Sequence, residues 1–396
     1  MRSSTRWPPR CAADADGPRA SAGMERDTCR ESDALHERAR AMVRSFERGA
    51  PRPEGFDALA IDLARFQAAH VPGYARLCAA RGVDPSAFAR ASDAPAVPAD
   101  AFKLASVFCF EDRAATVTFR TSGTTVGARG THAMRDVRTY DAAALVFGRA
   151  MFARDLIAPV PVLVIGPPEA EAPDSSLAHM CGLFARAFGV AESLERTFFV
   201  RQGTLLVDDL RTRVAALNRT DPVAILATSF ALVHLTDVLG SDVLALPSGS
   251  RVMQTGGFKG RSREVVAGDL RRTVARAFAV DERAVVSEYG MTELSSQLWE
   301  ATLVDERALP GIYVEPPWLR VVAVDPESLA PLPDGTAGIA RIEDLANVDS
   351  AFAVLVPDRV RRVEGGIELL GRAPGAPPRG CSIALDEMLG AREGAP

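Results

Sequence analysis

Long apolar runs, paired cysteines and lysines are scarce in this chain of 396 residues, and each scarcity excludes a class of protein. The longest nearly apolar stretch, 158–165, contains prolines and is far shorter than the ~20 residues of a membrane-spanning helix. The six cysteines form no C-x-x-C pair and only five histidines are present, so no zinc-ligand spacing occurs. We therefore expect a protein of the cytoplasm with free thiols and without stable membrane insertion.

Positive charge is limited as well. The net charge of -5 argues against nucleic acid as a partner, because nucleic-acid-binding proteins concentrate positive charge. Lys103 and Lys259 are the only lysines, so nearly all positive charge is arginine. Because the net charge is negative, an anion bound by this chain is expected to be small.

The length and the hydrophobic fraction of 47% are those of an ordinary soluble core, with room for one large α/β domain and a smaller unit. Residues 1–30 are rich in Arg, Ala, Ser, Asp and Pro without an apolar segment, which predicts a disordered extension and not a signal peptide. The rest divides into a large domain, 31–357, β-rich from about residue 310, and a short C-terminal segment, 358–396.

Helical and strand-like patterns alternate along the large domain. Helical spacing of apolar residues predicts helices at 31–48 and over 56–81, with a break at Pro72. Further helices are predicted at 137–152, 177–188, 205–218 and 230–239, and strands at 105–110, 116–119, 161–165, 223–227, 251–254, 284–286, 319–324, 338–342, 351–356 and 366–370. The alternation predicts an α/β fold with mostly parallel sheets flanked by helices, whose ligands bind at the carboxyl ends of strands.

A loop rich in glycine and hydroxyl residues follows the predicted strand 116–119. The stretch 119–132 reads Phe-Arg-Thr-Ser-Gly-Thr-Thr-Val-Gly-Ala-Arg-Gly-Thr-His, which offers N–H groups, hydroxyls and positive charge to a phosphate chain. It is not a Walker A loop, because it has neither that glycine spacing nor a lysine. An ordinary surface turn is the alternative. The candidate phosphate-binding residues are Thr121, Ser122, Gly123, Thr124, Thr125, Gly127 and Arg129.

A second stretch, 287–297, reads Ser-Glu-Tyr-Gly-Met-Thr-Glu-Leu-Ser-Ser-Gln. A purely structural explanation is a strand, a glycine turn and a helix start, with Thr292 as N-cap and Glu293 at the positive end of the helix dipole. Gly256 and Gly257 similarly follow the predicted strand 251–254. They either end that strand or let the backbone lie close to a ligand, where a side chain would clash.

Both stretches resemble motifs of the acyl-adenylating superfamily, which includes acyl-CoA synthetases, firefly luciferase and the adenylation domains of peptide synthetases. The first resembles its phosphate-binding Thr-Ser-Gly-Thr-Thr-Gly motif and departs from it at Val126, and the second resembles its Tyr-Gly-x-Thr-Glu motif. With 254–260 and Arg-Gly-Cys-Ser at 379–382, the longer string 289–297 resembles the acyl-protein synthetase family, the long-chain-fatty-acid protein ligases of the bacterial luciferase fatty-acid reductase complex. This resemblance covers about residues 50–390.

The resemblance implies ATP and Mg²⁺ as cofactors and a fatty acid or other carboxylic acid as substrate. It further implies that Tyr289 stacks on adenine, that Thr292 contacts the α-phosphate and that Glu293 binds Mg²⁺, with Gly256, Gly257 and Gly290 beside the nucleotide. Mg²⁺ prefers oxygen ligands of the kind that Glu293 supplies.

The ribose ligand has two candidates. Asp358 and, fourteen residues later, Arg372 are spaced like the Asp of the superfamily's Thr-Gly-Asp motif and its Gly-Arg hinge, although Val-Pro replaces Thr-Gly. That Asp accepts both ribose hydroxyls in the superfamily. Asp358 as an ordinary turn residue is the structural alternative. Asp344 is the rival for the ribose role.

Cys381 is the predicted nucleophile. The resemblance implies that the acyl group passes to a cysteine near the C-terminus and then to a partner reductase or carrier protein. Arg379 would favour the thiolate of Cys381, and a thiolate attacks an acyl-adenylate to give a thioester. Most lone cysteines are instead small buried hydrophobes, which suits Cys78, Cys109 and Cys181.

The chain departs from the superfamily at its C-terminus, where a subdomain of about a hundred residues usually carries a catalytic lysine. No lysine follows Lys259, so we predict a strongly shortened C-terminal subdomain and a substitute cation, with Lys259, Arg129 or Arg261 as candidates. Two other functions stay open: an acyl- or aryl-CoA ligase, and a degenerate adenylation fold that binds a partner without catalysis.

Overall fold

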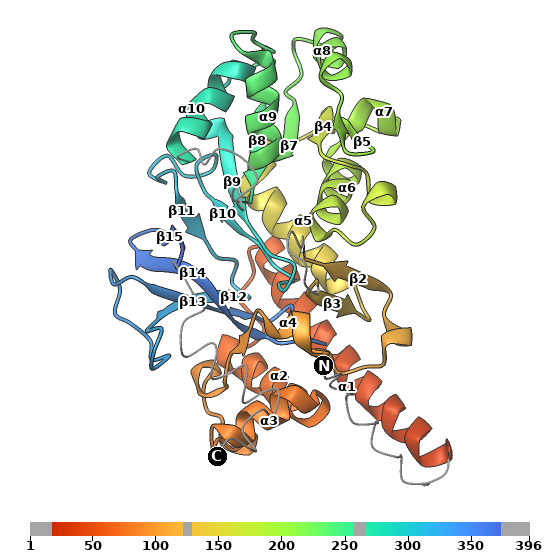
Figure 1. Ribbon diagram of the computed structural model, residues 1–396, viewed down its shortest axis with the longest axis vertical. Coiled ribbons are helices and arrows are strands. Elements are labelled where there is room, and N and C mark those ends of the chain that lie inside the picture. The colour runs from red at the N-terminus through yellow and green to blue at the C-terminus, as the bar shows by residue number, and fades with distance from the viewer. Residues whose placement is uncertain (1–17, 122–128, 257–266, 374–396) are drawn as a thin grey trace, which may run out of the picture.

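A mixed β-sheet runs through the computed structural model, of which residues 18–121, 129–256 and 267–373 are described (Figure 1). The strand order is β12-β13-β14-β15-β11-β10-β9-β8-β7-β4, and β1 pairs with β14 off this path. The strands are β1 (Val97–Pro98), β4 (Val162–Ile165), β7 (Ala224–Thr228), β8 (Arg251–Thr255), β9 (Val285–Tyr289), β10 (Leu298–Glu300), β11 (Ile312–Val314), β12 (Leu319–Val324), β13 (Gly338–Asp344), β14 (Ala353–Val363) and β15 (Gly366–Arg372).

One half of the sheet is parallel and is covered on both faces. Strands β4, β7, β8 and β9 run in the same direction. In β4, Val162 and Val164 belong to one apolar core while Leu163 and Ile165 belong to another, because successive side chains of a strand point to opposite faces. The first core includes α5 (Arg138–Phe152) and α6 (Ser176–Phe188), and the second includes α8 (Val207–Ala215), α9 (Ser229–Leu239) and α10 (Ala267–Phe278).

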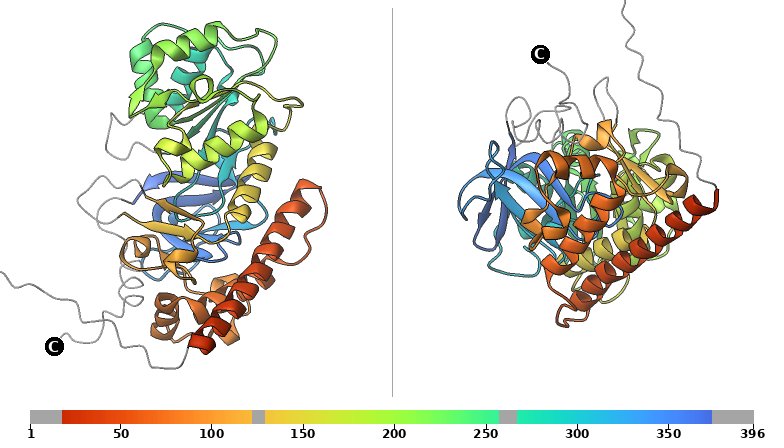
Figure 2. Two further views of the ribbon diagram at one scale, coloured as in Figure 1. Left: turned by 90° about the vertical axis from the view of Figure 1, so that its right-hand side faces the viewer. Right: turned by 90° about the horizontal axis from the view of Figure 1, so that it is seen from below.

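The other half of the sheet, from β10 to β15, is antiparallel. The helices α1 (Pro18–Glu47) and α2 (Phe56–His70) share the first core with its strands, and α3 (Pro72–Ala80) packs on α2. Figure 2 shows α1 lying beside α5, which it contacts, so the N-terminal helix bridges the two halves. In the described part of the chain, every helix is too short or too polar to cross a membrane.

Shorter elements complete the fold. The hairpin β2 (Val117–Arg120) and β3 (Thr131–Met134) flanks the predicted phosphate loop, and β5 (Val200–Arg201) pairs with β6 (Thr204–Leu205). The remaining elements are α4 (Ala101–Leu104), α7 (Leu194–Thr197) and the short 3₁₀ helices Pro85–Ala87, Ala91–Asp93, Asp112–Ala114, Glu169–Glu171 and Glu282–Ala284.

The predicted α/β class, with parallel strands flanked by helices and a β-rich part beyond residue 310, is confirmed. The helix α1 begins at Pro18, within the N-terminal stretch that the sequence predicts to be a disordered extension. Strand β14 continues through positions 357 and 358, where the sequence predicts a domain boundary. The break at Pro72 is also confirmed, because α2 ends at His70 and α3 begins with the proline at its first position.

One local prediction is wrong. Residues 105–110 form no strand, because backbone groups there bond to the 349–350 turn: the Cys109 N–H donates to the Asp349 carbonyl at 3.1 Å, and the Val107 carbonyl accepts from Ser350. The purely structural explanation of 287–297 does not hold either, because Thr292 caps no helix. The chain after Gly290 turns and enters β10, which pairs with β9.

Candidate functional site

Two of the predicted nucleotide residues lie where two neighbouring parallel strands end. β8 and β9 pair in parallel up to Thr255 and Glu288, so Gly256 and Tyr289 lie at the same edge of the sheet. Gly256 is exposed and has a φ of +75°, which favours glycine over residues with a Cβ. Ligands of α/β sheets bind at this edge.

Tyr289, Asp358 and Arg372 form one contact group, which we call the rim. The Tyr289 hydroxyl donates to Asp358 Oδ2 at 2.8 Å, and Arg372 Nε donates to Asp358 Oδ1 at 3.2 Å. Burial, and then the charge of Asp358, raise the pKa of Tyr289 well above its ordinary value, so its hydroxyl keeps the proton that it donates. The Asp358 side chain remains 22% exposed.

A strand irregularity brings the rim together. The register of β14 with β15 shifts between Asp358 and Val360, and opposite the shift Gly371 has a φ of +82°. A glycine at positive φ is typical of a β-bulge, which re-aims the neighbouring side chains. Arg372 consequently lies directly opposite Asp358 in the ladder.

Asp344, the rival for the ribose role, is fully buried. Its carboxylate accepts hydrogen bonds from the Ser295 N–H at 2.9 Å, the Ser296 hydroxyl at 2.7 Å and the Ala346 N–H at 3.0 Å. Burial raises the pKa of Asp344 to about 6, although these hydrogen bonds oppose the shift. Its oxygens are satisfied inside the protein, so the geometry favours Asp358 for a ligand.

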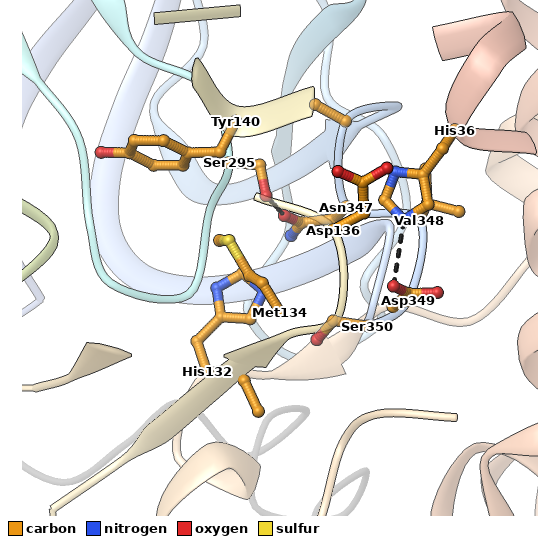
Figure 3. A pocket seen from close by; sticks show the side chains of 12 residues that line it. His36, His132, Met134, Asp136, Tyr140, Ser295, Asn347, Val348, Asp349 and Ser350 are labelled. Carbon is orange, nitrogen blue, oxygen red and sulfur yellow. Dashed lines mark hydrogen bonds and ion pairs between the residues drawn. The ribbon is translucent and has the colours of Figure 1, made fainter. Parts of the chain in front are cut away.

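Thr292 and Glu293 lie in a turn that is held by side chains from elsewhere. The Thr292 carbonyl is 2.7 Å from His132 Nδ1, and the Glu293 carbonyl accepts from Asn347 Nδ2 at 2.8 Å. Figure 3 shows His132, Ser295 and Asn347 around a small cavity of about 10 Å³. Neither His132 nor Asn347 was predicted, because no sequence pattern relates them to the motif.

Thr121 and Arg129 close the base of the predicted phosphate loop. The Thr121 N–H donates to the Gly130 carbonyl at 2.9 Å, and its hydroxyl accepts from the Gly130 N–H at 2.8 Å. Arg129 pairs with Asp174 at 2.5 Å and donates to the Thr121 carbonyl at 2.7 Å. Other predicted site residues lie outside the described residues, namely Ser122, Gly123, Thr124, Thr125, Val126, Gly127, Gly257, Lys259, Arg261 and Cys381.

The described residues hold no group of three or more His, Cys, Asp or Glu side chains that could bind a metal ion. Mg²⁺ at a nucleotide site needs only one or two carboxylates, because phosphate oxygens and waters complete its shell. Glu293, which is buried, fits this donor set by its chemistry.

Glu288 is a further buried acid that the sequence did not single out. It precedes Tyr289, accepts a hydrogen bond from the Thr255 hydroxyl, and burial raises its pKa to about 7. A Cβ at Gly290 would lie 2.5 Å from Glu288 Oε1, so the glycine leaves room for this side chain.

Comparison with protein families agrees with this geometry. The family model described as "Acyl-protein synthetase, LuxE" matches residues 51–390. The chain belongs to this family. No curated protein matches the chain significantly in sequence.

Solved structures show that this family member has the fold of acyl-adenylating ligases. A 2-hydroxyisobutyryl-CoA ligase in the postadenylation state superimposes with a TM-score of 0.57 at 15% identity, over 80% of this chain and 67% of that one. An open conformation of this ligase, in complex with 2-HIB-AMP and CoA, superimposes with a TM-score of 0.56 at 15% identity, over 80% of this chain and 74% of that one. ATP-bound MatB from Rhodopseudomonas palustris superimposes with a TM-score of 0.48 at 16% identity, over 67% of this chain and 50% of that one. The chain therefore spans about half of MatB's length.

Proposed function

We propose that the protein is an ATP- and Mg²⁺-dependent ligase of the cytoplasm. It activates a fatty or other carboxylic acid as acyl-adenylate and transfers the acyl group to a protein cysteine as a thioester, for delivery to a partner reductase or carrier protein. Family membership over residues 51–390 supports this proposal. The observation that carries it is the rim, which places Tyr289 and a partly exposed Asp358 in contact at the carboxyl edge of β9.

The rim and Gly256 suit a nucleoside. The Asp358 carboxylate has lone pairs for two ribose hydroxyls, while Tyr289 and Arg372 hold it in place. The proposal further has the partly buried Tyr289 ring stack on adenine, and Gly256 lets backbone approach a base without a clashing Cβ.

In the first step the substrate carboxylate attacks the α-phosphorus of ATP. A bond forms between a carboxylate oxygen and the α-phosphorus, the bond from the α-phosphorus to the oxygen that bridges to the β-phosphate breaks, and pyrophosphate leaves. The product is the acyl-adenylate, a mixed anhydride. Negative charge grows on phosphoryl oxygens, which the Thr292 hydroxyl and a cation would stabilise. When bound by Glu293, Mg²⁺ would neutralise part of this charge. The protein cation is then Lys259 or Arg261, because Arg129 is paired with Asp174.

In the second step the thiolate of Cys381 attacks the acyl carbonyl carbon, a thioester forms and AMP leaves. CoA as the thiol remains the alternative acceptor. The third candidate is a degenerate fold that binds a partner without catalysis, and it alone would remain if ATP does not bind.

Acid-dependent exchange of labelled pyrophosphate into ATP tests the adenylation step. A panel from acetate to palmitate, with aryl acids, should show exchange with at least one acid and identify its chain length. Calorimetry with ATP and Mg²⁺ complements it, since absent binding together with absent exchange would leave only the partner-binding function.

Acyl labelling without CoA tests the acceptor. The proposal expects acid-stable, hydroxylamine-sensitive label on the wild-type protein, which Cys381→Ser abolishes while exchange continues. Cys29→Ser, which removes a partly exposed free thiol, is the matched control and should keep the label. Label that survives Cys381→Ser would show that the nucleophile is wrongly assigned.

A further inference from the structure

Two consecutive carbonyl groups of the Thr292-Glu293 motif are fixed by side chains from distant parts of the chain. His132 lies 160 positions away in sequence and Asn347 54 positions away. Peptide carbonyls in such a turn would otherwise bond to water or to neighbouring backbone. Fixing both restricts the backbone from which the Thr292 and Glu293 side chains project.

His132 is suited to donate a single hydrogen bond. It is buried, and its ring meets Phe102 edge to face at 5.7 Å. Burial lowers the pKa of His132 to about 4, so the imidazole is neutral at physiological pH and carries one N–H. Because the Thr292 carbonyl can only accept, we assign that proton to Nδ1.

His132 also joins the motif to the hairpin that flanks the predicted phosphate loop. It belongs to β3 and is paired with Phe119 of β2. The contact with Thr292 therefore sets the distance between this hairpin and the turn after β9.

Asn347 uses its whole amide within the protein. Its Nδ2 donates to the Glu293 carbonyl and, at 3.0 Å, to the Ala351 carbonyl, while Oδ1 accepts from the Ser295 hydroxyl at 2.5 Å. The side chain is buried, and a fully satisfied buried amide has little freedom to move.

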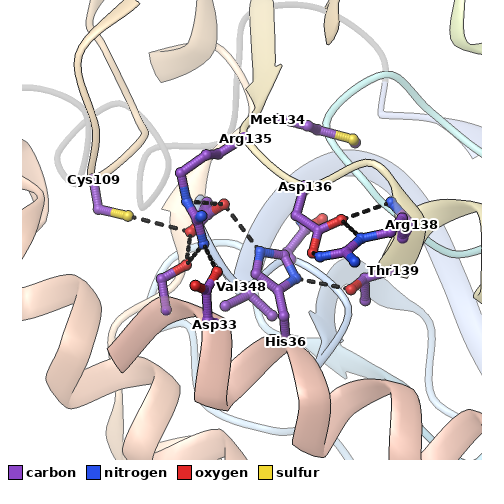
Figure 4. Close-up of polar contacts among 12 residues, drawn as sticks. Asp33, His36, Cys109, Met134, Arg135, Asp136, Arg138, Thr139 and Val348 are labelled. Atoms are coloured by element: carbon purple, nitrogen blue, oxygen red, sulfur yellow. Dashed lines mark hydrogen bonds and ion pairs between the residues drawn. The ribbon is translucent and has the colours of Figure 1, made fainter. Parts of the chain in front are cut away.

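The turn that carries Asn347 is itself anchored by helices α1 and α2. Asp349 accepts from Ser32 and lies 3.0 Å from His36, both of α1, and Arg135 is 3.7 Å from the same carboxylate. Figure 4 shows this contact group around His36 and Arg135. From α2, Gln67 donates to the carbonyls of Asn347 and Val348 at 3.0 and 3.1 Å.

We infer that His132 and Asn347 are positioning residues of the adenylation site, which hold the backbone of Thr292 and Glu293 so that both side chains point at the reacting phosphate. The inference rests on the proposed function. Its geometric basis is the pair of hydrogen bonds to adjacent carbonyls, supported behind Asn347 by the contacts of Asp349.

The first test compares two replacements of His132 in pyrophosphate exchange. His132→Leu removes the donor, and kcat should fall on the order of ten- to a hundredfold, as for other residues that orient a reacting group. The KM for ATP should change little, because the rim is untouched. His132→Asn places an amide N–H near the Nδ1 position and should recover most of the rate. A merely structural role would instead lower activity and melting temperature together in both variants.

A double variant tests whether His132 acts through Thr292. If it does, His132→Leu with Thr292→Ala should lose no more rate than Thr292→Ala alone. Fully additive losses would overturn the inference. Asn347→Asp, an isosteric change that removes the donor to Glu293, decides the matter if His132→Leu does not fold. Asn218→Asp, at an exposed position, is its control.

The outcomes separate the two proposals. Absent exchange in the wild-type protein would overturn the adenylating function and this inference with it. Exchange in the wild type that is undiminished in both His132→Leu and Asn347→Asp would overturn only the positioning role.

Discussion

Aspartates Asp344 and Asp358 lie in the same antiparallel half of the sheet, yet their surroundings differ completely. Asp344 begins the buried turn 344–350, where N–H and hydroxyl donors occupy its oxygens. Asp358 lies at a bulge of β14, partly exposed, and contacts only the side chains of Tyr289 and Arg372 among its described partners. The first carboxylate holds the segment of Ser295 and Ser296 from inside, whereas the second keeps exposure and lone pairs for a ligand.

The difference shows how aspartate can either stabilise the protein interior or remain available to a ligand at the surface. A buried acid whose oxygens accept hydrogen bonds from within the protein cannot turn toward a ligand without leaving donors unpaired. Asp358 accepts one side-chain hydrogen bond on each oxygen and is 22% exposed, so a ligand can add to these contacts at small cost.

The largest effect on the free energy of unfolding is expected in the buried turn 344–350. Asp344→Ala leaves three donors without an acceptor and should lower the free energy of unfolding by about 3–5 kcal/mol. Urea denaturation measures it, with Asp334→Ala in an exposed turn as control, expected within about 0.5 kcal/mol. A loss below about 1 kcal/mol for Asp344→Ala would show that the turn does not depend on this carboxylate.

The contribution of the buried Glu288, which precedes Tyr289 of the rim, to the free energy of unfolding should depend on pH. Its folded pKa of about 7 lies above the ordinary 4.5, so the folded state retains a proton that the unfolded state loses between these values. The contribution of Glu288 to stability should therefore fall by about 3 kcal/mol as pH rises through this window. Urea denaturation of wild type and Glu288→Gln at pH 4, 6 and 8 measures it. A constant difference between the two proteins would contradict the burial of a protonated acid.

At the rim the expected effect is on binding. Asp358→Ala should raise the KM for ATP about ten- to a hundredfold, the loss expected for hydrogen bonds to a charged group. Because Asp358 is partly exposed, the free energy of unfolding should change by less than about 1 kcal/mol. Exchange kinetics measure the change in KM for ATP, and urea denaturation of the same preparation measures the change in the free energy of unfolding. An unchanged KM would remove Asp358 from the nucleotide site.

The smallest effect is expected at the ion pair beside the phosphate loop. Asp174→Asn breaks a partly exposed pair with Arg129 and should cost about 0–1 kcal/mol of stability in urea denaturation. Added salt should shrink the difference further. A cost above about 2 kcal/mol would mean that this pair behaves as a buried ion pair and not as a partly exposed one.

Much of the parallel half could be predicted from the sequence. Its helices and strands are encoded by local patterns, such as the helical spacing behind α5 and α6 and the short apolar runs of β4 and β7. Gly256 directly follows a strand, as the same patterns predict, whereas β9 extends three residues beyond the predicted strand 284–286, to Tyr289. Residues 105–110 show the limit, because their apolar pattern is equally compatible with an irregular segment whose backbone bonds to another turn.

Local patterns are therefore sufficient to predict the α/β class, the break at Pro72 and the two motifs, since each depends on neighbouring residues alone. That Asp358 contacts Tyr289 while Asp344 is enclosed, and that His132 reaches Thr292, follows from the assembled fold. These contacts depend on strand order, on a register shift at one bulge and on burial. No local pattern specifies them, because each joins segments that only the assembled sheet and its helices bring together.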